Sequence, residues 1–288
     1  MRSNSDGRVF AKLSIIGPDK AGVVAAVTNF LFSHAGNVEE ISQHVVNGLF
    51  GMHLEASWKK EALDPAKVKA GLVKVGQELA MDVRITFESE HSRKRMALLV
   101  TKEPLCPETI LAEWKAGRLK AEIPVIIGSE KALEPLAKKY GIPFHLVDDE
   151  KQEAREEKTL KLLEKYEIDF LVLARYMKIL SPNFVWRYPN RIINIHPSLL
   201  PAFPGARAYL QAYERGVRIV GCSAHFVTMD LDQGPIICQD CFKAEFGEPL
   251  EEIKRKGQEL EAKTLLEAVK LFLDNKLDVY WNKVHLKK

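Results

Sequence analysis

The chain has 288 residues, of which 46% are hydrophobic and 28% charged, so the composition excludes intrinsic disorder and the length favours two domains. Its 42 basic and 39 acidic residues are interspersed and leave a net charge of +3, so we expect no nucleic-acid-binding face. With no apolar run of about 18 residues, no signal-peptide pattern at residues 1–8 and only four cysteines, we expect a cytoplasmic protein without a membrane span or a disulfide scaffold.

The first elements alternate in the order strand, helix, strand, strand, helix, strand. A strand at 9–16 runs into a turn at 17–19, where Asp19 is available to cap a helix at 22–34. Gly36 is expected to end that helix in the left-handed conformation. Strands near 41–46 and 51–58, a helix at 65–79 and a strand at 82–87 complete a βαββαβ unit. This order predicts a small antiparallel sheet with two helices on one face.

The unit at residues 1–88 resembles the ACT domain, a small module that senses ligands or pairs subunits. The resemblance rests on Gly-Pro-Asp-Lys-Ala-Gly-Val-Val at 17–24 and on Gly-Asn-Val at 36–38. It implies a ferredoxin-like fold and a homo-oligomer, either a dimer or a tetramer. It also implies an amino-acid effector site at the strand-to-helix turn, with Asp19, Ala21, Gly22 and Asn37 as candidates. The alternative is a domain that only assembles subunits.

Residues 89–95 are polar and charged, and we interpret them as a linker. From residue 96 to 288, short apolar strands alternate with helices. We expect strands at 96–100, 125–127 and 170–174, and helices at 107–116, 130–140, 151–166 and 250–273. This alternation predicts a doubly wound α/β domain with a mainly parallel sheet. The charged residues at 148–165 are expected to form a solvated helix face, and residues 276–288 a packed or frayed tail.

Asn194 and His196 lie two residues apart in a strand-like run, so their side chains leave the same face. Prolines and a glycine follow and end the strand in a stiff loop, and open α/β sheets bind ligands at such strand ends. An amide and an imidazole that face one space can both donate to a carbonyl oxygen and stabilise an oxyanion. Asp232, in an acidic loop after a strand at 225–228, can act on water or on His196 if it reaches the same pocket.

The second domain resembles the 10-formyltetrahydrofolate formyltransferase fold. The matching runs are Asn-Ile-His-Pro-Ser-Leu-Leu-Pro at 194–201, Pro-Gly at 204–205, His-Phe-Val at 225–227 and Leu-Asp-Gln-Gly-Pro at 231–235. The resemblance implies that Asn194, His196 and Asp232 are the catalytic residues. Residues 174–182, Ala-Arg-Tyr-Met-Lys-Ile-Leu-Ser-Pro, resemble the segment that holds the pteridine ring. The resemblance thus implies that a folate substrate is bound by Arg175, Tyr176, Met177, Lys178, Leu180 and His225.

The segment 101–108, Thr-Lys-Glu-Pro-Leu-Cys-Pro-Glu, disfavours a phosphoribosyl acceptor for the formyl group. It has no glycine, its two prolines lack N–H donors, and its two glutamates would repel phosphate. A transfer RNA acceptor is disfavoured because no basic domain or stripe is present. An ACT-like domain ahead of the formyltransferase fold resembles the arrangement of formyltetrahydrofolate deformylases, in which water is the acceptor. The resemblance therefore implies hydrolysis of 10-formyltetrahydrofolate to formate and tetrahydrofolate, with no cofactor.

Two departures from the deformylase pattern bear on the acceptor. The family usually carries Ser-His-Cys-Leu where this chain has Pro-Leu-Cys-Pro at 104–107, and commonly has two adjacent histidines where this chain has His-Pro at 196–197. Two alternatives therefore stay open: a formyltransferase with an amine acceptor, and a non-catalytic regulator that senses folate or an amino acid.

The cysteines in the second domain offer a weak pattern of metal ligands. Cys238 and Cys241 are three residues apart, and Cys222 and His225 could add further ligands. Residues three apart on a strand face opposite sides, and a second pair with this spacing is absent. We expect free thiols and no metal.

Overall fold

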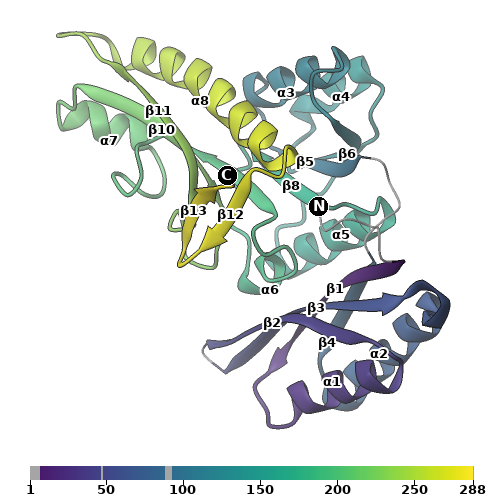
Figure 1. Cartoon of the computed structure of the whole chain (residues 1–288). Coiled ribbons are helices and arrows are strands. Elements are labelled where there is room, and N and C mark those ends of the chain that lie inside the picture. The colour runs from purple at the N-terminus through teal and green to yellow at the C-terminus, as the bar shows by residue number, and fades with distance from the viewer. Residues whose placement is uncertain (1–6, 47, 88–92, 288) are drawn as a thin grey trace. The chain divides into compact units, whose positions relative to one another are not determined.

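The structure is a computed structural model of the whole chain, and it describes residues 7–46, 48–87 and 93–287 (Figure 1). The chain divides into two compact units, Met1–His91 and Ser92–Lys288, each with its own hydrophobic core. The linker expected at 89–95 lies mostly outside the described residues. Its last two residues, Lys94 and Arg95, belong to the first strand of the second unit.

The first unit is a four-stranded antiparallel sheet with two helices on one face (Figure 1). The strand order is β2-β3-β1-β4, and apolar side chains of both helices pack against the sheet. This is the βαββαβ arrangement that the sequence predicts. The elements are β1 (Arg8–Pro18), α1 (Val23–Ser33), β2 (Asn37–Val46), β3 (Leu49–Lys59), η2 (Lys60–Ala62), α2 (Pro65–Leu79) and β4 (Asp82–Phe87).

Both ends of α1 differ from the expectation. The Asp19 side chain does not cap the helix, because the N-cap is Gly22, which has a left-handed φ of 90°. After the helix, the left-handed residue is Ala35, with a φ of 58°, and not Gly36. A Cβ on Gly36 would lie 2.9 Å from the ring of Trp58. Glycine is therefore needed at position 36 for close packing and not for backbone conformation.

The second unit contains a seven-stranded sheet in the order β11-β10-β9-β8-β5-β6-β7. Strands β9, β8, β5, β6 and β7 run parallel, while β10 and β11 add two antiparallel strands at one edge. The elements are β5 (Lys94–Val100), α3 (Leu105–Lys115), β6 (Ala121–Gly128), η3 (Lys131–Leu133), α4 (Glu134–Tyr140), β7 (Phe144–Leu146), α5 (Gln152–Lys165), β8 (Phe170–Ala174), α6 (Pro182–Val185), β9 (Ile192–His196), α7 (Ala208–Glu214), β10 (Ile219–Phe226), β11 (Ile236–Lys243), α8 (Leu250–Leu273), β12 (Leu277–Tyr280) and β13 (Lys283–Leu286).

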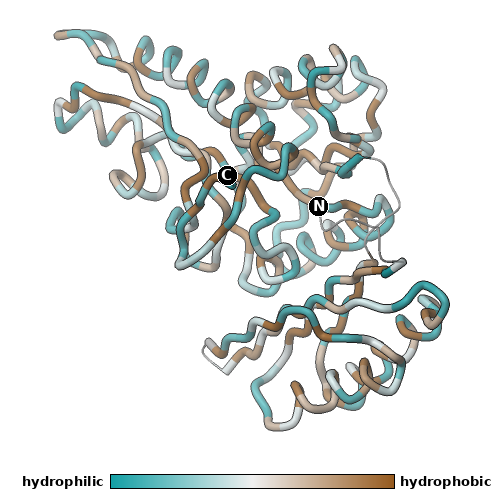
Figure 2. The backbone as a smooth tube through the Cα atoms, viewed as in Figure 1, coloured by the Kyte–Doolittle hydropathy of each residue, from teal (hydrophilic) through white to brown (hydrophobic). Residues whose placement is uncertain are grey.

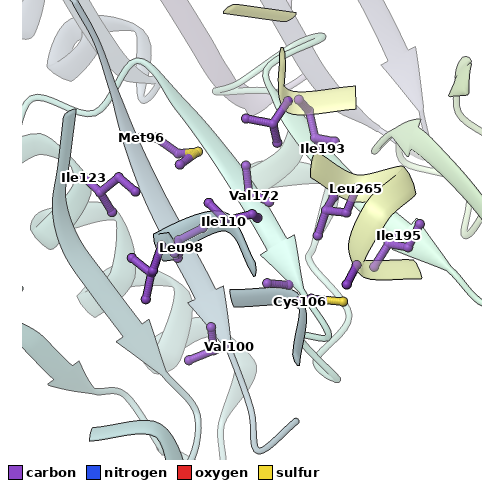
Figure 3. Close-up of a cluster of buried hydrophobic side chains, with 14 of the residues drawn as sticks. Met96, Leu98, Val100, Cys106, Ile110, Ile123, Val172, Ile193, Ile195 and Leu265 are labelled. Carbon is purple, nitrogen blue, oxygen red and sulfur yellow. The ribbon is translucent and has the colours of Figure 1, made fainter. Parts of the chain in front are cut away.

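Side chains of the central strand β5 alternate between two hydrophobic cores. Met96, Leu98 and Val100 pack under α3 and α8 on one face, as Figure 3 shows. Ala97 and Leu99 pack with α5 and α6 on the other face. Helices on both faces make the sheet doubly wound, as predicted.

Hydropathy along the chain follows this arrangement. The central strands are mostly hydrophobic, while the long helix α8 alternates between hydrophobic and hydrophilic residues (Figure 2). Within the described ranges, no helix combines the length and the apolar character that crossing a membrane requires.

Of the two expectations for the C-terminal segment, packed or frayed, the described residues 276–287 show the packed one. Strands β12 and β13 pair as an antiparallel hairpin, and residues 281–282 form its turn. Nδ2 of Asn282 donates a hydrogen bond to the carbonyl oxygen of Gln233 at 3.2 Å. The hairpin therefore contacts the loop that contains Asp232.

Candidate active site

A pocket of about 640 Å³ lies at the carboxyl ends of β8 and β9. Further lining comes from the loops at 205–207 and 227–232 and from α7 and α8. It is lined by all nine site residues that the sequence assigns to this domain, namely Arg175, Tyr176, Met177, Lys178, Leu180, Asn194, His196, His225 and Asp232. The structure therefore brings together residues that are up to 57 positions apart in the sequence.

The carboxylate of Asp232 meets the ring of His196. Nδ1 of His196 lies 3.2 Å from Oδ2 of Asp232, and the two side chains are only 5% and 7% exposed. The backbone N–H of Gly205 donates a second hydrogen bond to the same Oδ2 at 2.8 Å. The other oxygen, Oδ1, lies 3.8 Å from Nε2 of His225, beyond hydrogen-bond distance. Oδ1 therefore has lone pairs that can accept from a water molecule.

The loop between β10 and β11 positions Asp232. The φ of Asp232 is 56°, a left-handed value that aspartate tolerates better than most residues. The N–H of Phe226 donates to the carbonyl oxygen of Pro235 at 2.9 Å, so the loop returns to the end of β10. A Cβ on Gly234 would lie 1.7 Å from the carbonyl oxygen of Phe226. Only glycine fits this close approach.

The pKa of Asp232 lies below its ordinary value of 3.8. Burial raises the pKa of this carboxyl, but the hydrogen bonds from His196 and from the N–H of Gly205 outweigh that effect. Asp232 is therefore an ionised carboxylate at neutral pH.

Both ring nitrogens of His196 face acceptors. Nε2 lies 2.9 Å from the carbonyl oxygen of Phe203, which can only accept, so Nε2 carries a hydrogen. Nδ1 faces the ionised carboxylate of Asp232. This arrangement differs from the expectation that His196 donates directly to a formyl oxygen, because both of its ring nitrogens face acceptors of the protein.

The amide of Asn194 is oriented by His225. Nδ1 of His225 lies 2.9 Å from the carbonyl oxygen of Phe226 and therefore carries the hydrogen. Burial lowers the pKa of His225, which keeps the ring neutral and leaves a lone pair on Nε2. Nδ2 of Asn194 lies 3.2 Å from this Nε2 and donates to it. The second N–H of Nδ2 remains for a ligand in the pocket.

The predicted folate-binding segment follows β8 and is fixed through its backbone. The N–H of Met177 donates to Oγ1 of Thr101 at 3.0 Å, and Nε2 of Gln152 donates to the carbonyl oxygen of Ile179 at 3.1 Å. Ser181 caps α6, since its side chain accepts from the N–H of Phe184.

One residue of α5 supports this segment and was not recognised from the sequence. Glu156 accepts hydrogen bonds from the backbone N–H of Ser181, at 2.7 Å, and from its hydroxyl group. Both Arg155 and Glu156 are buried, so the expectation of a fully solvated charged face on α5 is wrong at these positions. Apolar residues at helical spacing from Glu156, such as Leu160 and Leu163, were the available signal.

Arg175, which lines the pocket, makes an ion pair with a buried glutamate. Its Nη1 lies 3.1 Å from Oε2 of Glu261 in α8, whose side chain is fully buried. The hydroxyl group of Tyr209 in α7 donates to Oε1 of the same carboxylate. Burial raises the pKa of Glu261, and the charge of Arg175 opposes this. Sequence reasoning missed Glu261 and Tyr209, although an acid at apolar spacing in α8 is a signal of a buried charge.

Comparison with known proteins identifies the family of each unit. Residues 94–269 match the model of the formyl transferase family, and residues 12–86 match that of the ACT domain. The chain is 40% identical over 277 residues to a formyltetrahydrofolate deformylase of Bacillus subtilis (strain 168), covering 94% of this chain and 92% of the relative. The chain belongs to the formyltetrahydrofolate deformylase family. The predictions of the family, of an enzyme and of the fold class are thereby confirmed.

Solved structures with this fold fall into two groups. A formyltetrahydrofolate deformylase from Pseudomonas syringae pv. tomato str. DC3000 has a TM-score of 0.66 and 33% identity, covering 98% of this chain and 95% of that chain. A glycinamide ribonucleotide transformylase from Symbiobacterium toebii has a TM-score of 0.65 and 32% identity, covering 70% of this chain and 97% of that chain. Relatives with this fold therefore carry the names of two different activities, a deformylase and a transformylase.

The four candidate effector residues of the first unit do not lie together. Asp19, Ala21 and Gly22 are exposed in the turn after β1. Asn37 begins β2 at the other end of the sheet, where β3 connects it to Phe10, about 26 Å along the strands from the end of β1. Its Nδ2 donates to Oε1 of Glu39 at 2.9 Å. An effector site within this unit can therefore use the turn or Asn37, but not both.

Two of the four cysteines donate hydrogen bonds within the protein. Sγ of Cys222 donates to Oγ1 of Thr264 at 3.3 Å, and Sγ of Cys238 donates to the carbonyl oxygen of Thr264 at 3.4 Å. Cys241 is exposed. In the part of the chain that the structure describes, no group of three or more histidines, cysteines and acidic residues could hold a metal ion.

Proposed function

We propose that this chain hydrolyses 10-formyltetrahydrofolate to formate and tetrahydrofolate. The observation that carries the proposal is the pair of His196 and Asp232, 3.2 Å apart and next to Asn194 in a pocket lined by the segment 175–180. The name shared by the relatives in this family supports the same substrate and reaction.

In this mechanism, Asn194 binds the oxygen of the formyl group. One N–H of Asn194 Nδ2 contacts His225, and the other donates a hydrogen bond to the formyl oxygen. This hydrogen bond becomes stronger as negative charge develops on the oxygen. We assign the protonated form to His196, because its ring nitrogens face a carbonyl oxygen and a carboxylate, and its positive charge then adds to the stabilisation. The site thus stabilises a tetrahedral oxyanion by one direct donor and one fixed charge.

Asp232 acts on the attacking water. Oδ2 already accepts from His196 and Gly205, so we assign the water to Oδ1. A carboxylate with a lowered pKa is too weak a base to deprotonate water in advance. Asp232 therefore accepts the proton at the same time as the water oxygen attacks the formyl carbon. The intermediate then collapses, the bond between the formyl carbon and N10 breaks, and the proton passes to N10. The products are formate and tetrahydrofolate, and no oxidant or reductant is required.

A regulator that binds folate without turnover is the weaker alternative. Burial of the charged pair His196–Asp232 costs desolvation energy, which an apolar pair of similar size would avoid. A protein that only binds folate has no need for this pair.

We further propose that the first unit assembles subunits into a dimer or tetramer and offers the turn at 19–22 to an amino-acid effector. Strand β2 is an edge of its sheet, and its side chains Ile41 and Val45 are 43% and 51% exposed. We also propose a cytoplasmic location, because all four cysteines are free thiols, as is usual in a reducing compartment.

The deciding experiment incubates the purified chain with 10-formyltetrahydrofolate and no amine acceptor, and measures formate and tetrahydrofolate. We expect catalytic formate release that falls about 100- to 1,000-fold in Asp232→Asn, because the substituted amide cannot accept the proton of water. Formate release no faster than the uncatalysed reaction would contradict the proposed function.

A further inference from the structure

A cluster of three polar side chains, of which Tyr209 and Glu261 are buried and Arg175 is partly buried, lies beside the catalytic residues and takes no part in the proposed chemistry. Arg175, Glu261 and Tyr209 are joined through the carboxylate of Glu261, which accepts from both partners. Arg175 and Tyr209 line the pocket next to Asn194 and His196, whereas Glu261 is fully buried behind them.

The cluster occupies the topological switch point of the sheet. The chain passes from β5 outward to β6 and β7, and then returns to β8 on the other side of β5. Open α/β sheets bind ligands in the crevice at the carboxyl ends of the two strands where this reversal occurs. Arg175 is the first residue after β8, and the loop at 101–104 follows β5. The crevice that the fold offers to ligands is therefore the space around Arg175.

The pocket stops at this cluster. Its lining includes Arg175 and Tyr209 but none of the described residues from 101 to 107, which follow β5. Cys106, in the first turn of α3, is buried. It is close enough to Glu261 and Arg175 for their charges to act on the pKa of its thiol. Arg175 and Glu261 therefore lie near both the pocket and the first turn of α3, which follows β5.

The packing around the cluster leaves little freedom. Arg175 has a left-handed φ of 60°, a conformation that most side chains avoid. A Cβ on Gly257 would lie 2.2 Å from the hydroxyl oxygen of Tyr209, so a glycine is needed for the ring to reach Glu261. A buried ion pair rarely stabilises a fold more than apolar side chains of the same volume would. Stability alone therefore does not account for three polar side chains at this place.

We propose that Arg175, Glu261 and Tyr209 determine the formyl acceptor, by filling the switch-point crevice so that water reaches the formyl carbon and an amine substrate does not. This inference rests on the proposed hydrolysis and explains its specificity. Transfer to an amine would need the amine nitrogen to attack the formyl carbon, lose a proton and leave N10 protonated. That reaction is redox-neutral like hydrolysis, so access of the nucleophile is what distinguishes the two.

The test measures how the formyl group is partitioned between two acceptors. Wild type and variants are incubated with 10-formyltetrahydrofolate and an excess of glycinamide, a small amine, and formate and N-formylglycinamide are quantified. We expect the wild type to give formate only. Arg175→Ala combined with Glu261→Ala opens the crevice without leaving an unpaired buried charge, and Tyr209→Ala opens it from α7. Both should form N-formylglycinamide at least about tenfold faster than the background reaction measured without enzyme.

Glu261→Gln is the matched control, because it keeps the volume of the cluster and its contacts to Arg175 and Tyr209. It should give formate as its only product. If the wild type releases formate and the folded, opened variants still divide the formyl group between water and glycinamide as the wild type does, the inference is wrong and the proposed function stands. N-formylglycinamide produced by the wild type overturns it without any variant, and a wild type that releases no formate overturns the proposed function as well. Thermal unfolding of each variant shows which of them are folded.

Discussion

His225 accepts a hydrogen bond from Asn194, with 3.2 Å between Nε2 and Nδ2. The resemblance to the formyltransferase fold implied a folate-binding role for His225, yet its side chain is only 2% exposed and its ring contacts another site residue. The carbonyl oxygen of Phe226 fixes the tautomer, so the lone pair of Nε2 faces the amide. We therefore propose His225 as a positioning residue that determines which way the Asn194 amide points.

Replacing His225 by phenylalanine removes the acceptor and frees the Asn194 amide to rotate. We expect kcat for formate release to fall about 10- to 100-fold with little change in KM, because orientation of one oxyanion donor is lost while the folate-binding segment is intact. His225→Gln is the control, since its side-chain oxygen can accept from Nδ2 and should restore part of the rate. Equal rates in the two variants would show that the hydrogen bond to Asn194 does not matter.

Removing the amide itself tests the oxyanion donor directly. Asn194→Ala should lower kcat about 100- to 1,000-fold, the usual loss for one such donor, and should weaken folate binding much less. Steady-state formate release gives kcat, and fluorescence titration with tetrahydrofolate gives the affinity. Unimpaired turnover in Asn194→Ala would remove this residue from the mechanism.

Gly234 allows the loop that contains Asp232 to pack closely against the end of β10. The Cβ of an alanine at this position would lie 1.7 Å from the carbonyl oxygen of Phe226, so the loop must move away from β10. Gly234→Ala should therefore displace Asp232 and reduce formate release about 100-fold or more. Gly117→Ala is the control: this glycine has a positive φ, but its Cβ would meet open space. A Gly234→Ala enzyme with normal kcat would show that the loop tolerates the shift.

The sequence predicted most elements because their signals are local. The bounds of α2, β4, β8 and α8 agree with the expected ranges, since proline, glycine and apolar spacing mark them clearly. The three-residue strand β7 was missed, because so short a run has no periodicity. The hairpin of β12 and β13 was also missed, since its turn contains Trp281 and Asn282 at positive φ in place of the usual glycine.

The candidate site shows where sequence reasoning ends. Asn194, His196 and Asp232 were found because a strand places the first two on one face and a known motif contains all three. The partners of these residues were not found, because they depend on contacts between distant segments. The backbone carbonyl oxygen of Phe203 contacts His196. Every residue type has this oxygen, so the contact cannot be predicted from the type of residue at position 203. Glu261 lies 86 positions from Arg175, and only the packing of α8 brings them together.

The lowered pKa of His225 predicts a pH dependence of folding. Above its ordinary pKa of 6.5, the ring is neutral in both the folded and the unfolded chain. As the pH falls below 6.5, the unfolded chain binds the proton first, because burial disfavours the charged ring in the folded state. The unfolded state then holds more protons, so the free energy of unfolding decreases with falling pH until the folded pKa is reached. A tenfold difference in proton affinity between the two states corresponds to about 1.4 kcal/mol.

Urea denaturation of the wild type and of His225→Phe, from about pH 8 to about pH 5, measures this contribution. The variant should lose less stability than the wild type over this range, whatever its absolute stability. Asp232 does not interfere, because its lowered pKa contributes stability that is lost only as the pH falls below about 3.8. Equal losses in the wild type and His225→Phe would show that the ring is not held neutral, and the tautomer assigned to His225 would then be wrong.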